Sequence, residues 1–310
     1  MPQIMSAFAE NDGLAAEFVL GTLDADEHAH ARSLLAEDED FAAKVKVWER
    51  RLGELHLMVE PVEPEAKIWA RIKAKMSEVQ QKSQLPEAEI PPPAPAAATT
   101  AEPPSLDAIE AAISQATTTL TSEAASAAGT EATPVEITWL LAAVAKGDRG
   151  AFERLYNASS AKLYGVVLRI VRRHELSAEV MEQAYLEIRG RAGEFNPAHS
   201  SPIAWMVAIA RRLAIDLSRR PQAAGDDREP EVIDESEGPA TVPRHQLTDD
   251  LKRLLTCIGR LEPDRQRMLL LAYYGAFSRD QLSTKLDVPV DLLKVSVRRS
   301  LLEVEQCLKS

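Results

Sequence analysis

The chain has 310 residues, of which 45% are hydrophobic and 5% aromatic, and a formal net charge of -12 at pH 7. This length exceeds that of a typical single helical domain, so two or three folded units are expected. No apolar run approaches the roughly 20 residues that a membrane span needs, and the N-terminus lacks a secretory signal pattern. We therefore expect a cytoplasmic protein without a membrane segment.

Cysteine and histidine usage argues against a disulfide scaffold or a metal centre. Cys257 and Cys307 are the two cysteines, and in a reducing cytosol we expect them to be buried thiols. No cysteine lies within residues 1–136 to complete a zinc site with the histidines there, so no metal or other cofactor is expected. Phosphate-binding glycine loops, zinc-protease helices and nucleophile elbows are also missing from the sequence, which indicates a protein that is not an enzyme.

Charge is unevenly distributed along the chain. Residues 1–136 carry 10 Lys and Arg against 24 Asp and Glu, whereas residues 137–220 carry 13 against 8 and residues 244–310 carry 12 against 9. An acidic first part and two basic parts are typical of a protein whose basic parts bind nucleic acid and whose acidic part contacts them within the same chain. A merely solvated charged surface is the alternative.

Helical periodicity dominates the first part of the chain, and no alternating strand pattern persists anywhere, so the predicted fold class is all-α. Residues 1–76 are expected to form a helical domain. Thr22 or Asp24 can cap its second helix, with Glu27 placed for a capping box. A turn near Glu37–Asp40 should begin the next helix with acidic residues.

Two segments have the composition of linkers. Residues 77–134 are rich in Ala, Pro, Thr, Ser and Glu, and residues 221–247 combine Gly and Pro with acidic residues. Such segments bury too little apolar surface to offset the entropy of ordering. One weak amphipathic turn, Leu106–Ile113, is expected within the first linker.

The stretch Ser201–Arg220 carries the strongest helical pattern. Its apolar residues recur every four positions, and basic residues crowd its C-terminal half. The apolar stripe is Trp205, Ile209, Leu213 and Leu217, and the basic residues are Arg211, Arg212, Arg219 and Arg220. We interpret the four arginines as contacts to DNA phosphates. Trp205 could stack on a flipped base, but its place in the apolar stripe favours a core anchor.

Further motifs precede this helix in residues 135–220. They are Ala151–Phe152, Leu155–Tyr156, Leu163–Tyr164, Phe195–Asn196–Pro197 and Ser201–Pro202. Together they resemble region 2 of a sigma factor of the extracytoplasmic-function type. The resemblance implies a module that binds core RNA polymerase through one helix and opens promoter DNA with another, which lies on the minus-ten element.

The acidic helix Ala178–Ile188 is the segment that this resemblance assigns to polymerase. Its candidate contacts are Glu179, Glu182, Gln183 and Tyr185. The glutamine and an acidic residue are exchanged relative to the family pattern. Glu187 and Arg189 stand where relatives carry a basic residue and a tryptophan, which changes the charge on this face.

Residues 248–310 resemble sigma region 4 at Leu261–Asp264, Ala272–Tyr274 and Phe277–Leu282. The resemblance implies a helix-turn-helix in which Ser278 caps one helix and Asp291–Leu308 is the recognition helix. Its core stripe is predicted to be Leu293, Val297, Leu301, Val304 and Leu308, and its DNA-facing cations are predicted to be Lys294, Arg298 and Arg299.

Leu292 and Val295 occupy positions where relatives carry hydroxyl residues. Apolar side chains can contact thymine methyl groups, so binding to an upstream promoter element stays open. The alternative is a degenerate helix-turn-helix that contacts protein.

The first domain carries the motifs Ala15–Leu23, Trp48–Leu52 and Ile68–Ile72. These resemble the cytoplasmic domain of anti-sigma factors of the anti-sigma-K kind. The resemblance implies a domain that lies between regions 2 and 4 and masks their polymerase-binding surfaces, with Phe18, Leu20, Trp48 and Trp69 at the interface. An unrelated helical bundle is the alternative.

The predicted function is transcription initiation by a sigma-70 family factor that binds core RNA polymerase and promoter DNA and is inhibited in cis by its first domain. The alternative is a non-initiating interaction protein, such as a scaffold or sigma mimic, whose first domain captures a separate sigma factor in trans. The arginines of the Ser201–Arg220 helix favour the first function. Glu187, Leu292 and Val295 favour the second.

Overall fold

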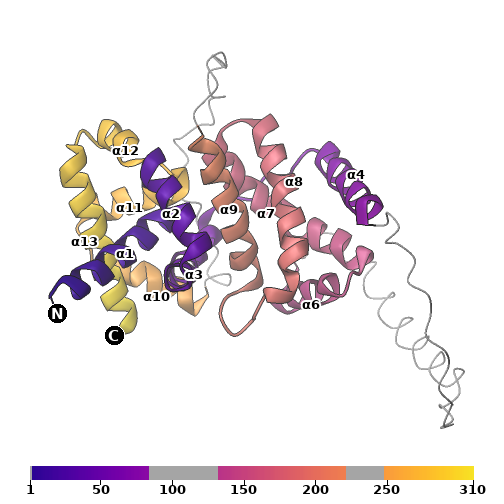
Figure 1. The fold of residues 1–310 in the computed structure, drawn as a ribbon, viewed down its shortest axis with the longest axis horizontal. Coiled ribbons are helices and arrows are strands. Elements are labelled where there is room, and N and C mark those ends of the chain that lie inside the picture. The colour runs from indigo at the N-terminus through magenta and orange to yellow at the C-terminus, as the bar shows by residue number, and fades with distance from the viewer. Residues whose placement is uncertain (1, 84–131, 221–247) are drawn as a thin grey trace, which may run out of the picture. The chain divides into compact units, whose positions relative to one another are not determined.

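The computed structural model describes residues 2–83, 132–220 and 248–310 (Figure 1). All regular elements in these ranges are helices, which confirms the predicted all-α class. None of these helices is long and apolar enough to cross a membrane. The two predicted linkers, including the turn expected at Leu106–Ile113, lie outside the described residues apart from 77–83 and 132–134.

The chain divides into two compact units. One contains residues 1–75 together with 134–310, and the other contains residues 76–133. The first unit therefore joins the acidic N-terminal part with both sigma-like parts. We call its residues 2–75 the front segment.

The front segment begins with three α-helices, α1 (Pro2–Leu20), α2 (Ala25–Glu37) and α3 (Glu39–Gly53). Asp24, one of the two predicted caps, begins α2 by accepting from the Glu27 amide at 2.8 Å. Asp38 caps α3, whose first turn carries two further acids. The apolar face of α3 includes the buried Trp48, whose indole donates to the Asp12 carboxylate at 3.2 Å on α1.

The chain then leaves α3 through a 3-10 helix, η1 (Glu54–Met58), and reaches α4 (Ala66–Ser83). Residues 59–65 between them form no regular element, and we call them the strap. The strap contains Pro61 and Pro64, which cannot donate backbone hydrogen bonds and disfavour a helix. An extended strap is the consequence.

The predicted region 2 consists of four helices, α6 (Pro134–Ala145), α7 (Arg149–Val171), α8 (His174–Arg191) and α9 (Pro202–Ser218), with a short 3-10 turn η2 (Ala192–Glu194). Asp148 and Ser201 cap α7 and α9. The buried face of α9 differs from the predicted stripe. It is formed by Met206, Val207, Ile209, Ala210, Arg211, Ala214 and Ile215, whereas Trp205, Leu213 and Leu217 are half-buried.

The predicted region 4 also consists of four helices, α10 (Asp249–Ile258), α11 (Pro263–Gly275), α12 (Arg279–Leu286) and α13 (Val290–Lys309). Ser278 caps α12 with a full capping box, as expected. Asp287 ends α12 in the left-handed region at φ 54°, which short polar side chains tolerate better than most. The buried stripe of α13 contains the first four predicted residues, and Leu308 is half-buried.

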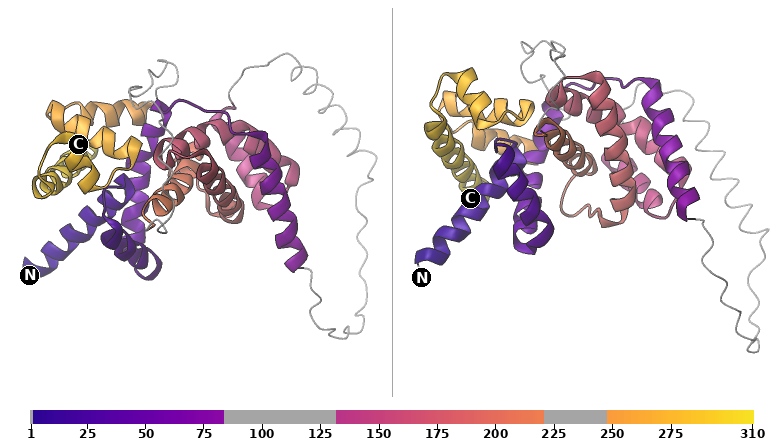
Figure 2. Two further views of the ribbon diagram at one scale, coloured as in Figure 1. Left: turned by 90° about the horizontal axis from the view of Figure 1, so that it is seen from above. Right: turned by 45° about the horizontal axis from the view of Figure 1, so that its top comes forward.

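Figures 1 and 2 show α1–α3 beside both α9 and the helices α11–α13. Backbone contacts agree with these views, because the Arg279 amide at the start of α12 donates to the Thr22 carbonyl at 3.0 Å. The front segment is therefore packed against both sigma-like parts.

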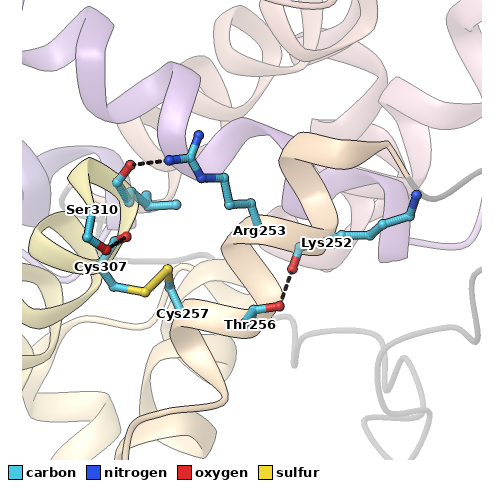
Figure 3. Close-up of a disulfide and its surroundings, with 7 residues drawn as sticks. Lys252, Arg253, Thr256, Cys257, Cys307 and Ser310 are labelled. Carbon is cyan, nitrogen blue, oxygen red and sulfur yellow. Dashed lines mark hydrogen bonds between the residues drawn. A yellow bond between two sulfur atoms is a disulfide. The ribbon is translucent and has the colours of Figure 1, made fainter.

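The cysteine prediction was wrong. Cys257 on α10 and Cys307 on α13 are joined in a disulfide (Figure 3). The Arg253 guanidinium also donates to the Leu308 carbonyl at 3.2 Å. The two residues are 50 positions apart in sequence, and only the return of α13 onto α10 brings them together.

The double substitution Cys257→Ser and Cys307→Ser should lower the free energy of unfolding by about 2 to 4 kcal/mol, because a cross-link over 50 residues restricts the unfolded chain. Urea unfolding followed by circular dichroism measures the loss. A reductant should produce the same loss in the parent chain and none in the serine variant. Equal stability of all four samples would contradict the prediction.

Candidate nucleic-acid and polymerase interfaces

Arg211 lies at the centre of the contact between α9 and the front segment. The last carbonyls of a helix lack intrahelical partners and carry partial negative charge. The Arg211 guanidinium donates to two such carbonyls of α1, those of Val19 and Leu20, the latter at 2.9 Å. It also donates to the Tyr273 carbonyl at 2.8 Å and lies 4.4 Å from the centre of that tyrosine ring. Arg211 is thus buried, and burial lowers its guanidinium pKa.

Arg219, the first residue after α9, makes a similar set of hydrogen bonds. It donates to the carbonyls of Gly21 at 2.6 Å and Leu23 at 3.0 Å, just after α1. It also donates to the Ala276 carbonyl at 2.7 Å, just after α11. Burial lowers the pKa of Arg219 to about 10, so the side chain stays charged at neutral pH. Arg211 and Arg219 therefore bind the C-terminal ends of α1 and α11 together.

The other two predicted DNA contacts on this helix lie differently. Arg212 is half-buried and pairs with Glu187 on α8, which also accepts from Arg191 at 2.8 Å. Arg220 is exposed. Glu187, noted as a departure from the family pattern, thus serves as a partner for cations of region 2.

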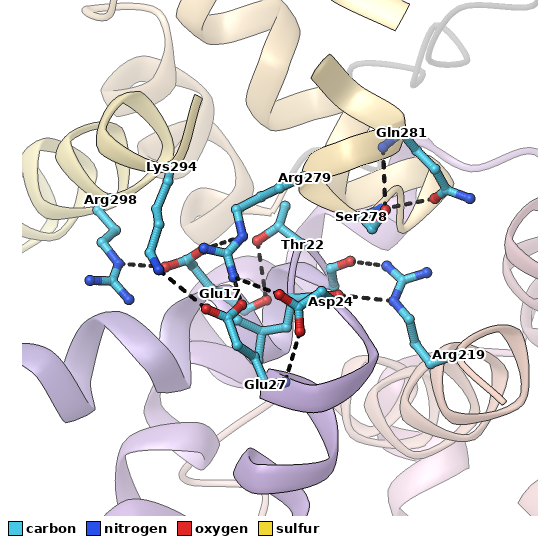
Figure 4. Close-up of polar contacts among 12 residues, drawn as sticks. Glu17, Thr22, Asp24, Glu27, Arg219, Ser278, Arg279, Gln281, Lys294 and Arg298 are labelled. Carbon is cyan, nitrogen blue, oxygen red and sulfur yellow. Dashed lines mark hydrogen bonds and ion pairs between the residues drawn. The ribbon is translucent and has the colours of Figure 1, made fainter. Parts of the chain in front are cut away.

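The cations of α13 face carboxylates of the front segment (Figure 4). Arg298 pairs with Glu17 of α1 at 2.6 Å, and Lys294 pairs with Glu27 of α2 at 3.2 Å. Glu17 is fully buried. Arg299 instead pairs with Glu303 on its own helix at 3.0 Å and stays exposed. Two of the three predicted DNA-contacting cations of α13 are therefore held by acidic residues of the same chain.

Arg279 completes this cluster and was missed by sequence reasoning. It is buried at the start of α12, pairs with Glu27, and lies 3.6 Å from Glu17. Asp24, whose other oxygen caps α2, lies 4.0 Å away. The cluster places several carboxylates of the front segment where a DNA phosphate would otherwise be attracted.

A second set of contacts joins α2 to α9. His28 is buried, stacks on Phe18 with ring centres 4.9 Å apart, and its Nε2 lies 2.7 Å from Asp216 on α9. Arg32 lies 3.6 Å from the other oxygen of Asp216. Phe18, predicted at the interface, thus packs behind a side chain that contacts region 2 directly.

The predicted polymerase helix α8 is contacted by α4. Glu182 is fully buried and pairs with Arg71 and, at 2.5 Å, with Lys75. Tyr185 lies in the core, where its hydroxyl is 2.7 Å from Ser159 and burial raises its pKa. Its ring lies 4.8 Å from that of Tyr156.

The remaining candidates of this group lie close to that contact. Trp69 of α4 stacks on Tyr156 with ring centres 4.6 Å apart, so a predicted interface residue meets region 2 through an aromatic pair. Glu179 accepts from the Gln183 amide at 3.5 Å, and both are half-buried. Leu20 is buried, and its carbonyl binds Arg211. Trp48 makes its indole hydrogen bond within the front segment.

The strap crosses α7 in backbone contact. The Val62 amide donates to the Ala161 carbonyl at 2.9 Å, and Lys162 donates to the carbonyls of Leu57 and Val59 at 3.2 and 2.6 Å. A Cβ atom on Gly165 would lie 2.4 Å from the Glu60 carbonyl oxygen. The strap can therefore reach α7 only where a glycine leaves room for its backbone.

Glu54 joins the N-terminal caps of two helices. The hydroxyls of Ser201, which caps α9, and Thr248, which caps α10, donate to its two carboxylate oxygens at 3.1 and 3.0 Å. Burial raises the pKa of Glu54. His56 beside it is buried, and burial lowers its pKa to about 4, an effect to which the charge of Lys162 adds.

A cavity of about 270 Å³ lies between α3 and the start of region 2's last helix. Lys46 and Arg50 line it from the front segment, and Asn196, His199 and Trp205 line it from region 2. The ring centres of Trp205 and Phe195 are 5.5 Å apart. Asn196 of the Phe195–Asn196–Pro197 motif thus lies across this cavity from α3.

Comparison with known proteins decides the family. The family model for sigma-70 region 2 matches residues 155–224. The chain is 31% identical over 172 residues to the ECF RNA polymerase sigma factor SigK of Mycobacterium tuberculosis, which covers 54% of this chain and 91% of that protein. The SigK of Mycobacterium ulcerans is 29% identical over 177 residues, with the same coverage.

The chain belongs to the ECF family of RNA polymerase sigma factors. Members of this family are not enzymes; they bind core RNA polymerase and promoter DNA to initiate transcription. Neither comparison assigns a family to the front segment, so its function has to be argued from its contacts.

The substitution Arg211→Met should lower the free energy of unfolding by about 3 kcal/mol, because it leaves buried helix carbonyls without donors. The exposed Arg220→Met is the matched control and should change stability by less than about 0.5 kcal/mol. Urea unfolding measures both. Equal effects would mean that burial of Arg211 contributes nothing to this fold.

Lowering the pH from 6.5 to 5.5 should destabilise the fold through His56. Its folded pKa of about 4 lies below the ordinary 6.5, so the unfolded chain binds the proton first and stability falls as pH decreases. The loss should be about 1 kcal/mol over this range and absent in His56→Phe. The raised folded pKa of Glu54 makes its contribution to stability change with pH in the opposite direction. The parent and the His56→Phe chain should therefore be compared with Glu54→Gln present in both. Parallel pH profiles of stability for the two chains would contradict this role for His56.

Proposed function

We propose that this ECF sigma factor is inhibited in cis by its front segment. In this state α1–α3, the strap and α4 hold regions 2 and 4 and cover surfaces that core polymerase and promoter DNA require. Displacement of the front segment exposes these surfaces and permits initiation. The proposal assigns residues 1–76 an anti-sigma function and places the protein in the cytoplasm, where transcription takes place.

The observation that carries the proposal is the pairing of the predicted DNA-binding cations. Arg211 and Arg219 of α9 bind carbonyls at the end of α1, and Lys294 and Arg298 of α13 bind carboxylates of α1 and α2. Each of these acceptors competes with a phosphate oxygen for the same donor. DNA binding through these side chains therefore requires the front segment to leave.

The polymerase-binding helix supports the proposal independently. Arg71 and Lys75 neutralise Glu182 of α8, while Trp69 covers Tyr156 beside it. A carboxylate already paired with two cations has less electrostatic attraction for a basic surface of polymerase. The front segment thus opposes both binding partners at once.

A non-initiating interaction protein is the second candidate. It is favoured by Glu187, which pairs with Arg212, and by the exposed apolar residues Leu292 and Val295 on α13. Under this function the front segment would bind another sigma factor in trans. A chain released from inhibition that binds core polymerase but yields no transcript from any selected promoter would favour this second function.

The substitution Gly165→Ala tests inhibition without touching a predicted DNA or polymerase contact. The added methyl group meets the Glu60 backbone and should displace the strap, at a cost of about 1 to 3 kcal/mol to the inhibited state. We expect about 10-fold stronger binding to core polymerase and more transcript in vitro. Fluorescence anisotropy with labelled core polymerase and run-off transcription measure the two effects.

Gly190→Ala on α8 is the matched control, because a Cβ atom there meets no heavy atom within 4 Å. Both substitutions favour helix by about 1 kcal/mol, so the control isolates the clash with the strap. Lys162→Met, which removes the ammonium group that binds the strap carbonyls, should act in the same direction as Gly165→Ala. Equal polymerase binding by all four chains would overturn inhibition in cis and leave the sigma family assignment intact.

A further inference from the structure

The cavity between α3 and region 2 has walls from two parts of the chain that are distant in sequence. Lys46, Val47, Glu49 and Arg50 of α3 form one wall, and side chains from residues 191–208 form the other. Its volume of about 270 Å³ lies near the lower end of the range for small-molecule sites, roughly 300 to 1,000 Å³. The space therefore suits one small molecule that touches both walls.

Two cations on the α3 wall have no acidic partner. Lys46 and Arg50 are exposed and four positions apart, so they lie on the same face of the helix. Neither forms an ion pair with any residue that the structure describes, whereas the adjacent Arg51 pairs with Glu305 at 3.0 Å. Like charges at this spacing repel each other. An anion between the two side chains would relieve this repulsion.

The carboxyl groups of the cavity do not neutralise this wall. Glu194 is held by Arg191 at 3.0 Å. Glu49 is half-buried, and burial raises its pKa, which the charges of Arg212, Arg191 and Lys46 only partly offset. Burial thus disfavours the charged form of Glu49. The lining as a whole contains three lysine and arginine side chains against two carboxyl groups, so it attracts an anion.

The opposite wall offers a planar apolar surface. Trp205 is half-buried, and its ring is tilted by 53° from that of Phe195, with the ring centres 5.5 Å apart. Ala204 and Ala208 line the cavity beside it, and their small side chains leave room next to the indole. Indole rings stack well on other planar rings. This wall therefore suits the flat apolar part of a ligand, with the Asn196 amide available at the rim.

We propose that this cavity binds a small organic anion in which one planar ring carries a phosphate or carboxylate group. The anionic group lies between Lys46 and Arg50, and the ring lies against Trp205. A guanidinium group binds either anion through two parallel hydrogen bonds, which fixes the orientation of the ligand. Each wall supplies one half of the recognition, so the site is complete only while α3 is packed on region 2.

A ligand of this kind is coupled to the position of the front segment. Because it contacts both walls, it binds the packed arrangement in preference to a separated one and so favours packing. At ten times its Kd it shifts the equilibrium about 10-fold toward the packed arrangement. This consequence rests on the proposed inhibition in cis, under which the ligand holds the sigma factor inactive. The binding site itself does not depend on that function.

Isothermal titration calorimetry of the full chain tests the site. Phenyl phosphate, benzoate and adenosine monophosphate each combine a ring with an anionic group, whereas inorganic phosphate and phenol supply only one of the two. We expect at least one ring-bearing anion to bind about 10-fold more tightly than either fragment, because burying a ring adds apolar contact to the ionic one. Comparison of the three identifies the preferred anionic group and ring.

Substitutions separate the two walls. Lys46→Gln and Arg50→Gln should each weaken binding about 10-fold, as expected for loss of a hydrogen bond to a charged group. Lys44→Gln, on α3 but outside the cavity lining, is the matched control and should bind as the parent does. Trp205→Leu should remove the preference for a ring over inorganic phosphate, and Trp205→Phe should retain it. Thermal unfolding without ligand shows whether each variant is folded.

Three results contradict the proposal. The first is no binding of any ring-bearing anion at millimolar concentration, and the second is equal affinity for phenyl phosphate and inorganic phosphate. The third is unchanged affinity in both Lys46→Gln and Arg50→Gln. The effect of the ligand on binding to labelled core polymerase is measured separately by fluorescence anisotropy. Binding with the expected pattern of variants but no effect on polymerase affinity would support the site and argue against inhibition in cis.

Discussion

The packing of this protein depends on two arginines that bind the carbonyl ends of two helices. Arg211 and Arg219 extend from α9 and donate to backbone oxygens at the ends of α1 and α11. Each helix end presents partial negative charge that a cation stabilises, by up to about 2 kcal/mol in partly buried sites. The C-terminal part of α9 therefore contacts an element of the front segment and an element of the predicted region 4 at the same place.

This arrangement buries part of the surface that we predict to bind DNA. A buried guanidinium needs hydrogen-bond acceptors that compensate its charge, and for Arg211 backbone carbonyls accept these bonds in place of a carboxylate. Around it, Glu17 and Glu27 supply full charges to Arg279, Lys294 and Arg298. Under the proposed inhibition in cis, removing the front segment would take away the carboxylate partners of Arg279, Lys294 and Arg298, and so change the surface charge.

The strap and η1 add contacts that depend on shape. Gly165 allows backbone to lie on backbone, and Glu54 joins the caps of α9 and α10 through two hydroxyls. These contacts are sensitive to single atoms, whereas the ionic cluster is spread over several side chains.

The sequence by itself determined the all-α class, the helix cap at Ser278, four of the five core-stripe residues of α13 and the resemblance to sigma region 2, and it limited the cap of α2 to Thr22 or Asp24. These follow from local chemistry, because a helix period, a capping oxygen and a motif spacing are written within a few residues. Its charge segregation also indicated an acidic partner within the chain. It did not identify Glu17, Glu27 or Arg279, since an acid or arginine on a helix has many possible partners.

Only the tertiary structure decided which cations are buried and what they bind. The helical stripe of α9 placed Arg211 on the outer face, whereas packing of α1 and α11 against α9 turned it into a buried ligand for carbonyls. The same holds for Cys257 and Cys307, which meet because α13 returns to α10. Burial and pairing depend on surfaces that are distant in sequence, and such surfaces are defined only once the helices have packed.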